Sequence, residues 1–433
     1  MRASTIAATF IVAVISAKAQ RVYVDDYEKR HTVSGKPKIV TFAHTAVSLF
    51  DYGLTTDQLI GTYGEYVIEK SDIDFNSPEQ TSSYTGDPEP EDLVRLQTVA
   101  NLSPECAQKP GYCTHFNLTM LLELDPDFLI VHGYGESPWG FQNFAEVTDA
   151  FPKEKIIFND IALEGQGCSN HTKCFGKSMI DIVEQYRDLA AFLGFDEPAS
   201  LEEDLKDLCA AAEEFVYQME IAHNNGVRAM AANLARSTVY FASPNTDMVL
   251  RMFEELGMPL FHVGACPSCT QTYFWEWVEV DKYFSACQEE VSESCNNETM
   301  YPVDVWIYDH RVRASIWSDE FAVQFPDKAL LAKQYAEWPL GGRKITPRHA
   351  IEILESVGPV LASATRLHPP TACIPDLDVS SNIFRRSGAD PSRGAGADLD
   401  DGKATGEDRS GTTHSIRSFL GILVACWFGV MLT

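Results

Sequence analysis

The stretch that decides the fold is SLEEDLKDLCAAAEEFVYQMEIAHNNG, residues 200–226. Ser200 and Glu203 have the spacing of a capping box, and Asn224-Asn225-Gly226 supplies a helix stop. Between them runs an apolar stripe at helical spacing, made of Leu201, Leu205, Leu208, Ala212, Phe215 and Met219. A helix of about 23 residues is roughly 35 Å long, at 1.5 Å per residue. That length is enough to run along two lobes rather than one.

Short apolar runs alternate with helical patterns on both sides of this helix. Before it, strands are predicted at 39–42, 59–62, 128–131 and 155–158, and helices at 45–52, 117–124 and 178–193. After it, strands are predicted at 227–231, 238–241, 260–263 and 303–308, and helices at 246–256 and 349–354. The pattern favours an α/β fold with two lobes of mostly parallel sheet, joined by one long bridging helix. The predicted boundaries are 36–198 for the N-terminal lobe, 199–225 for the helix and 226–372 for the C-terminal lobe.

Composition excludes several classes of protein. The chain has 433 residues, and its 34 Lys and Arg against 62 Asp and Glu give a formal net charge of −28. Hydrophobic residues make up 45% and charged residues 22%, which is close to the globular average and unlike a disordered or fibrous chain. A nucleic-acid surface needs an excess of basic residues, so no nucleic-acid partner is expected.

The two ends predict a secreted and tethered protein. Met1 and Arg2 precede an apolar run at 6–15 and the small residues of Ala17-Lys18-Ala19, which together predict a signal peptide over 1–19. A polar linker at 379–418 leads into an apolar tail at 419–433. The tail is short for a membrane span of about 20 apolar residues. It is predicted to be either a GPI-anchor signal or a short span, and both place the protein on the outer face of a cell.

Cysteines and glycosylation sequons fit a secretory route. Apart from Cys426 in the tail, ten cysteines remain, enough for five disulfides whose connectivity the sequence leaves open. Close spacing favours three local pairs, which are Cys106 with Cys113, Cys168 with Cys174, and Cys287 with Cys295. Sequons predict N-glycosylation at Asn101, Asn117, Asn170 and Asn297.

The order of these pieces resembles the class III, helical-backbone solute-binding proteins, which carry ferric siderophores, cobalamin, haem or metal ions. The matching pieces are KIVTFAHTAVSLFDYGL (38–54), NLTMLLELDPDFLIVHGYG (117–135), SMIDIVEQYRDLAAFLGF (178–195), TVYFASPNTDMVLRMFEELGMPL (238–260) and PVDVWIYDHR (302–311). The insert at 68–98 and the disulfides expected of the cysteines depart from that family. These departures suit an extracellular eukaryotic member, similar to algal surface siderophore-binding proteins. The resemblance implies a binding protein without enzymatic activity or intrinsic cofactor, in which the iron arrives as a siderophore complex.

Candidate binding residues follow the predicted strands, because open α/β sheets bind ligands beyond the carboxyl ends of their strands. They are His44, Tyr63, Glu65, Tyr66, Tyr134, Glu136, Trp139, Ser243, Asn245, Trp275, Trp277, Tyr308, Asp309, Arg311 and Arg313. Aromatic walls such as Trp275 and Trp277 suit the carbon skeleton of a ferric hydroxamate, and an Arg suits its oxygens. The predicted function is therefore capture of a ferric siderophore of the hydroxamate class, in a cleft between the two lobes, by a surface-tethered protein for iron uptake. The sequence does not identify the uptake partner.

Three alternatives remain open at this point. A metal ion is one, since His44, His132 and His310 all follow predicted strands and neutral imidazoles bind Zn²⁺ or Mn²⁺ together with a carboxylate. Haem or cobalamin on the same fold is the second. A secreted redox protein is the third, because Cys266-Pro-Ser-Cys269 has the spacing of a redox motif, although in a secreted chain with ten such cysteines a structural disulfide is the favoured interpretation.

Overall fold

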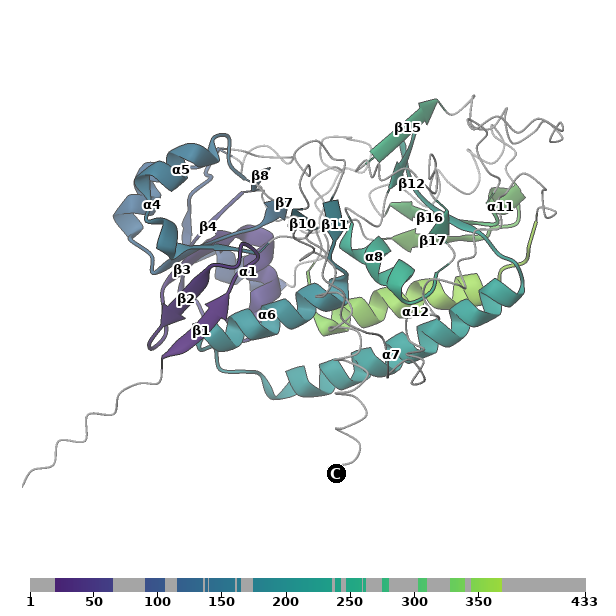
Figure 1. The fold of residues 1–433 in the computed structure, drawn as a ribbon, viewed down its shortest axis with the longest axis horizontal. Coiled ribbons are helices and arrows are strands. Elements are labelled where there is room, and N and C mark those ends of the chain that lie inside the picture. The colour runs from purple at the N-terminus through teal and green to yellow at the C-terminus, as the bar shows by residue number, and fades with distance from the viewer. Residues whose placement is uncertain are drawn as a thin grey trace, which may run out of the picture.

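The computed structural model describes fourteen segments of the chain. They are residues 20–64, 90–105, 115–134, 137–138, 140–159, 162–164, 174–235, 238–242, 247–258, 260–261, 275–279, 303–309, 328–338 and 344–367. Two α/β lobes lie side by side along two long helices, α7 (Ala199–Asn224) and α12 (Pro347–Ser363), as Figure 1 shows. The predicted signal peptide, polar linker and apolar tail lie outside the described residues.

The N-terminal lobe is built on a five-stranded parallel sheet in the order β5-β4-β3-β6-β9. Its strands are β3 (Ile39–Phe42), β4 (Leu59–Tyr63), β5 (Ala100–Asn101), β6 (Phe128–Val131) and β9 (Ile156–Phe158). Every residue of β3 and β6 is buried, as expected of central strands covered by helices on both faces. The helices of this lobe are α1 (Ala43–Phe50), α3 (Pro90–Gln97), α4 (Leu118–Leu124), α5 (Phe144–Ala150) and α6 (Met179–Leu193).

A hairpin that the sequence did not predict extends this lobe toward the N-terminus. Strands β1 (Arg21–Val24) and β2 (Arg30–Val33) pair antiparallel, and Tyr23 of β1 is buried in the lobe's core. The lobe therefore begins before residue 36, where the sequence placed its start. With only four residues in each strand, the hairpin carries too weak a period-two pattern to be recognised.

The helix starts show one correct prediction and one wrong one. Helix α6 begins after Ser178, which forms a capping box with Asp181, and ends at Gly194 in the left-handed conformation. Helix α7 begins after Pro198 and has no side-chain cap, so the capping box predicted for Ser200 and Glu203 is wrong. The helix starts one residue ahead of Ser200, which places that hydroxyl inside the first turn. The predicted apolar stripe is confirmed, since Leu201, Leu208, Phe215 and Met219 are buried.

The C-terminal lobe has a mixed sheet in the order β15-β13-β12-β16-β17, with β14 beside β12. Strands β12, β14, β16 and β17 run parallel, whereas β13 and β15 add antiparallel pairs. The elements are β12 (Ala229–Ala235), β13 (Thr238–Ala242), α8 (Met248–Glu255), β14 (Leu260–Phe261), β15 (Trp275–Glu279), β16 (Val305–Asp309), α11 (Lys328–Leu331) and β17 (Tyr335–Trp338).

Helix α12 is longer than the predicted 349–354 and packs along α7 (Figure 1). Pro359 lies inside the helix, although Gly358-Pro359 is a typical helix stop. Gly358 fits the close packing, because a Cβ at this position would lie only 3.1 Å from Cδ2 of the buried Phe215 ring of α7. The lobes are thus joined by two adjacent helices rather than by the bridging helix alone.

A small sheet lies between the labelled strands of the two lobes (Figure 1). It contains β7 (Gly133–Tyr134), β8 (Ser137–Pro138), β10 (Ala162–Glu164) and β11 (Cys174–Gly176), in the order β11-β10-β7-β8. A short 3-10 helix, η3 (Lys153–Lys155), precedes β9.

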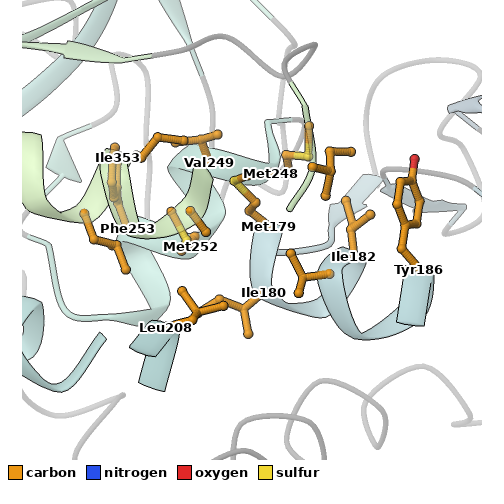
Figure 2. Close-up of a cluster of buried hydrophobic side chains, with 14 of the residues drawn as sticks. Met179, Ile180, Ile182, Tyr186, Leu208, Met248, Val249, Met252, Phe253 and Ile353 are labelled. Atoms are coloured by element: carbon orange, nitrogen blue, oxygen red, sulfur yellow. The ribbon is translucent and has the colours of Figure 1, made fainter. Parts of the chain in front are cut away.

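One apolar core continues from lobe to lobe. It contains Leu59 and Tyr186 of the N-terminal lobe together with Val305 and Trp338 of the C-terminal lobe. Figure 2 shows its middle, where side chains of α6, α7, α8 and α12 meet. These are Met179, Ile180, Leu208, Met248, Met252, Phe253 and Ile353. Among the described helices, none is both long and apolar enough to cross a bilayer.

Candidate functional site

The carboxyl edge of the N-terminal sheet brings together residues that follow three neighbouring strands. His44 lies just after β3, His132 directly follows β6, and Asn159 directly follows β9. Because β6 pairs with both β3 and β9 in parallel, these strand ends meet at one edge. The predicted proximity of His44 and His132 is therefore found in the structure.

Phe42 holds the two histidines in place. Its ring centroid lies 5.3 Å from that of His44 and 6.2 Å from that of His132, with the His132 ring nearly parallel to it. Gly64, at the end of β4, packs on the same phenyl ring, and a Cβ at this position would lie 2.1 Å from Phe42 Cε2. Gly64 also has φ +94°, so both the space and the backbone require glycine here.

Both histidines are held in the neutral form. Burial, helped by the nearby His132, lowers the pKa of His44 to about 3. Burial likewise lowers the pKa of His132 to about 4, against a hydrogen bond with the backbone of Asn159 that raises it. Neutral imidazole offers one N–H donor and one lone pair, the groups that contact an oxygen-rich ligand or a metal ion. His132 is only 4% exposed, whereas His44 is half-buried, so His44 is the more accessible of the two rings.

Tyr63 was predicted to face the ligand, but in the structure it is buried in the core of the N-terminal lobe. Its side chain is only 1% exposed, and its hydroxyl donates to the carbonyl oxygen of Ile130 at 3.2 Å. The ring packs against Phe116 and Phe141 at centroid distances of 5.4 and 4.7 Å. In this structure Tyr63 is a core residue of the lobe and offers no accessible surface to a ligand.

The C-terminal lobe contributes Tyr308 near the carboxyl end of β16. The side chain is buried, and its ring lies 5.9 Å from that of Tyr335 in an edge-to-face arrangement. Burial, followed by the charge of Glu337, raises the pKa of Tyr308 to about 12, so the phenol stays protonated. Asp309 is the last residue of β16 and is paired in register with Trp338.

Strand register relates Trp275 and Trp277 to Tyr308. Across the sheet, Tyr308 is level with Ala232, Phe241 and Glu276. Positions 275 and 277 flank Glu276 and therefore share the face opposite to that of Tyr308. The two tryptophan positions belong together, as predicted, but they occupy a different face of the sheet from Tyr308.

Several predicted residues lie outside the described part of the chain. Tyr134 is placed by its backbone, which pairs with Ser137 of β8 and Ala162 of β10. The candidates outside the described residues are Glu65, Tyr66, Glu136, Trp139, Ser243, Asn245, His310, Arg311, Arg313, Cys266 and Cys269. In the described segments no three His, Cys, Asp or Glu side chains are grouped as a metal site.

Sequence reasoning did not identify Phe42, Gly64 or Asn159 as part of this edge. Phe42 reads as an ordinary strand residue, and nothing in its neighbourhood distinguishes it from the other apolar residues of β3. Asn159 carried a usable signal, because it directly follows a predicted strand, as His132 does. Its side chain also contacts the hairpin, where the Tyr23 hydroxyl donates to Asn159 Oδ1 at 3.4 Å.

Only some of the cysteines and sequon asparagines predicted to be modified are among the described residues. Cys209 of α7 is disulfide-bonded. The pairs predicted from spacing involve Cys106, Cys113, Cys168, Cys287 and Cys295, which are outside the described residues, and Cys174, which is placed by its backbone alone. Asn101 and Asn117 are described, whereas Asn170 and Asn297 are not.

Solved structures of similar architecture exist. The crystal structure of DesE, a ferric-siderophore receptor protein from Streptomyces coelicolor, matches with a TM-score of 0.54 and 17% identity, over 80% of this chain and 100% of that chain. The petrobactin-binding protein YclQ from Bacillus subtilis matches with a TM-score of 0.48 and 11% identity, over 79% and 99%. The siderophore periplasmic binding protein from the fuscachelin gene cluster of Thermobifida fusca gives 0.45 and 13%, over 76% and 98%.

No family profile and no curated protein sequence matches the chain. The expected similarity to algal surface proteins is not tested by these matches and stays a prediction. The similarity to DesE covers that protein completely, and it agrees with the order of strands and helices described above. The chain therefore has the two-lobed α/β fold of the class III solute-binding proteins, with its lobes joined along a long helix.

Proposed function

We propose that this protein captures a ferric siderophore between its two lobes for iron uptake, and that it does so as a tethered protein outside the cell. The observation that supports this most directly is the fold, because DesE is a ferric-siderophore receptor protein and is matched over its whole length. Binding, without covalent chemistry, is the activity we expect.

The residues at the strand ends fit such a ligand. A ferric siderophore saturates the coordination of its own iron, so the protein has to contact oxygens and carbons rather than the metal. His44 is neutral and half-buried and offers a donor on the N-terminal side, and positions 275 and 277 share one face of β15 on the C-terminal side. We assign the hydroxamate oxygens to Arg311 or Arg313, whose charge strengthens each hydrogen bond.

A fluorescence-quench panel tests the proposal. The probes are iron-loaded desferrioxamine, an iron-loaded catecholate siderophore, haem, cobalamin and bare metal ions. We expect saturable binding of the iron-loaded hydroxamate and weaker binding of the others. Tight binding of haem, of cobalamin or of a bare ion with no binding of either ferric siderophore contradicts the proposal.

A metal ion is the second candidate ligand, and one observation favours it. His44 and His132 flank the same phenyl ring and are both neutral, which is the state in which imidazole binds a metal. The triple change of His44, His132 and His310 to Gln separates the two candidates. We expect it to leave the affinity for iron-loaded desferrioxamine largely intact, whereas a metal-ion site would be abolished.

The tether is proposed on the sequence of the C-terminal tail alone. Phosphatidylinositol-specific lipase should release the protein from intact cells if the tail at 419–433 is a GPI signal. Release by detergent only, with the Cys426 peptide retained in the mature chain, identifies a membrane span instead. Secretion of the protein without any tether contradicts both.

A further inference from the structure

Two of the predicted sequons lie side by side in the folded N-terminal lobe. Asn101 is the last residue of β5, and Asn117 is the residue that caps α4. The backbone N–H of Asn117 donates to the carbonyl oxygen of Leu102 at 2.8 Å, which places the two segments next to each other. Both asparagines are exposed, although Leu102 between them is fully buried.

Each asparagine uses the same atom of its side chain to support the fold. Asn101 Oδ1 accepts from the backbone N–H of Ser103 at 2.8 Å, and Asn117 Oδ1 accepts from that of Met120 at 3.0 Å. N-glycosylation replaces a hydrogen on Nδ2 and leaves Oδ1 free to accept. A glycan at either position is therefore compatible with the turn and with the helix cap.

We propose that Asn101 and Asn117 both carry N-linked oligosaccharides, which form a single patch over the outer side of the N-terminal lobe. In the transfer, Nδ2 attacks the anomeric carbon of an oligosaccharide carried on a polyprenyl diphosphate. The new C–N bond replaces the C–O bond to the diphosphate, which leaves with the lipid, and the amide loses one proton. The disulfide at Cys209 fits the oxidising compartment in which this transfer takes place.

The position of the patch gives it a role. Among the described strands, β5 is the last on its side of the sheet, and such edges pair readily with other chains. Helix α4 lies on the side of the lobe away from the C-terminal lobe (Figure 1), and its Leu122 is 45% exposed. Two bulky, hydrated oligosaccharides here shield the edge and the apolar side chain from self-association.

The two acceptor sites differ in when they are accessible. The hydroxyl residue of the first sequon, Ser103, is fully buried and its Oγ accepts from the backbone N–H of Gly64 at 2.9 Å. Thr119 of the second sequon is exposed. Asn101 must therefore be modified before β5 joins the sheet, whereas Asn117 remains accessible after the lobe has folded.

Heavy-oxygen labelling tests occupancy on the full chain produced in eukaryotic cells. Peptide N-glycosidase in heavy-oxygen water converts each glycosylated Asn to a labelled Asp, and an untreated sample controls for deamidation. We expect label at both Asn101 and Asn117. An unlabelled peptide at either position overturns the proposal of a paired site.

Matched variants separate the glycan from the fold. Asn101→Asp and Asn117→Asp keep the accepting oxygen, so each should fold and migrate faster on a denaturing gel by the mass of one glycan. Thr119→Ala destroys the second sequon without touching the cap, and should migrate faster by the same amount as Asn117→Asp. If Thr119→Ala migrates like the wild type, the assignment of Asn117 fails.

Trimming each glycan to its first sugar tests the shielding role, because trimming changes neither the protein's own charged side chains nor its internal hydrogen bonds. We expect the trimmed protein to self-associate, by sedimentation velocity, at concentrations at which the intact glycoprotein is monomeric. Identical sedimentation of the two forms refutes shielding.

Discussion

The backbone N–H of Ile345 donates to Ser48 Oγ at 2.8 Å, across 297 positions of sequence. The Tyr52 hydroxyl donates to the carbonyl oxygen of the same Ile345 at 3.3 Å. Next to it, Lys344 pairs with Asp51 and Asp92 of the N-terminal lobe at 2.8 and 3.0 Å. The start of α12 is thus fastened to the N-terminal lobe, while the rest of this helix packs on α7 and on the C-terminal lobe's β17.

Ser48→Ala should lower the free energy of unfolding by about 1–3 kcal/mol, because it leaves the buried Ile345 N–H without its acceptor. Chemical denaturation at neutral pH measures the change. Ser363→Ala is the matched control, since that hydroxyl is exposed and, within the described segments, donates to the carbonyl oxygen of Val360 in its own helix. Equal effects of the two changes contradict the role given to Ser48.

Asp25→Asn should destabilise the protein at neutral pH and have less effect in acid. Burial alone raises the pKa of Asp25, but hydrogen bonds from His31 and from the backbone of Lys29 and Phe158 outweigh it, and the folded pKa lies below 3.8. The carboxylate therefore contributes stability above pH 3.8, and this is lost as the pH falls through the folded value. Thermal unfolding of both proteins from pH 7 to pH 3 tests this; a constant difference contradicts it.

Glu184→Gln should stabilise the protein above neutral pH. Burial, followed by the charges of Asp181 and Asp188, raises the pKa of Glu184 to about 7. The wild type loses stability as the pH rises from 4.5 to about 7, because the unfolded chain releases this proton first. The variant's advantage should grow over that range and then level off. Glu220→Gln, on the exposed face of α7, is the control, and equal pH profiles for the two variants contradict the prediction.

Trp275→Ala and Trp277→Ala should each weaken binding of iron-loaded desferrioxamine about ten-fold or more, which corresponds to about 1.4 kcal/mol. The two positions share one face of β15, so their effects should occur together. Isothermal titration measures the affinities. Tyr217→Ala removes an aromatic side chain that is 58% exposed on α7, and it should leave the affinity unchanged. Wild-type affinity in both tryptophan variants excludes these positions from the binding surface.

Local sequence patterns were sufficient for most of the elements. The strand at 128–131 was predicted with its observed bounds, and the helix ending at Gly194 was predicted to within one residue. Both have strong signals within one turn or one strand, namely a run of apolar residues before His132 and a glycine that adopts the left-handed conformation. At the start of α7, the spacing of Ser200 and Glu203 predicted a capping box, but the helix begins one residue earlier, at Ala199, directly after Pro198.

The candidate site was predictable only in outline. That His44 and His132 follow neighbouring strands is a consequence of parallel pairing, which the alternation of strands and helices implies. That Tyr63 points into the core follows from its contacts with Phe116 and Phe141, which come from segments far along the chain. No local pattern specifies which face of a two-sided buried strand meets the ligand edge.

The alternating elements, the long helix and hence the two-lobed architecture follow from local sequence, because they depend on periodicity over neighbouring residues. The packing of α12 on α7 depends instead on tertiary contacts, since at Gly358 a Cβ would lie only 3.1 Å from the buried Phe215 ring of α7. Tertiary structure also decided that Asn101 and Asn117 share one surface, through a backbone hydrogen bond between Asn117 and Leu102. Both depend on contacts between distant segments, whose energies are realised only when the whole chain is packed.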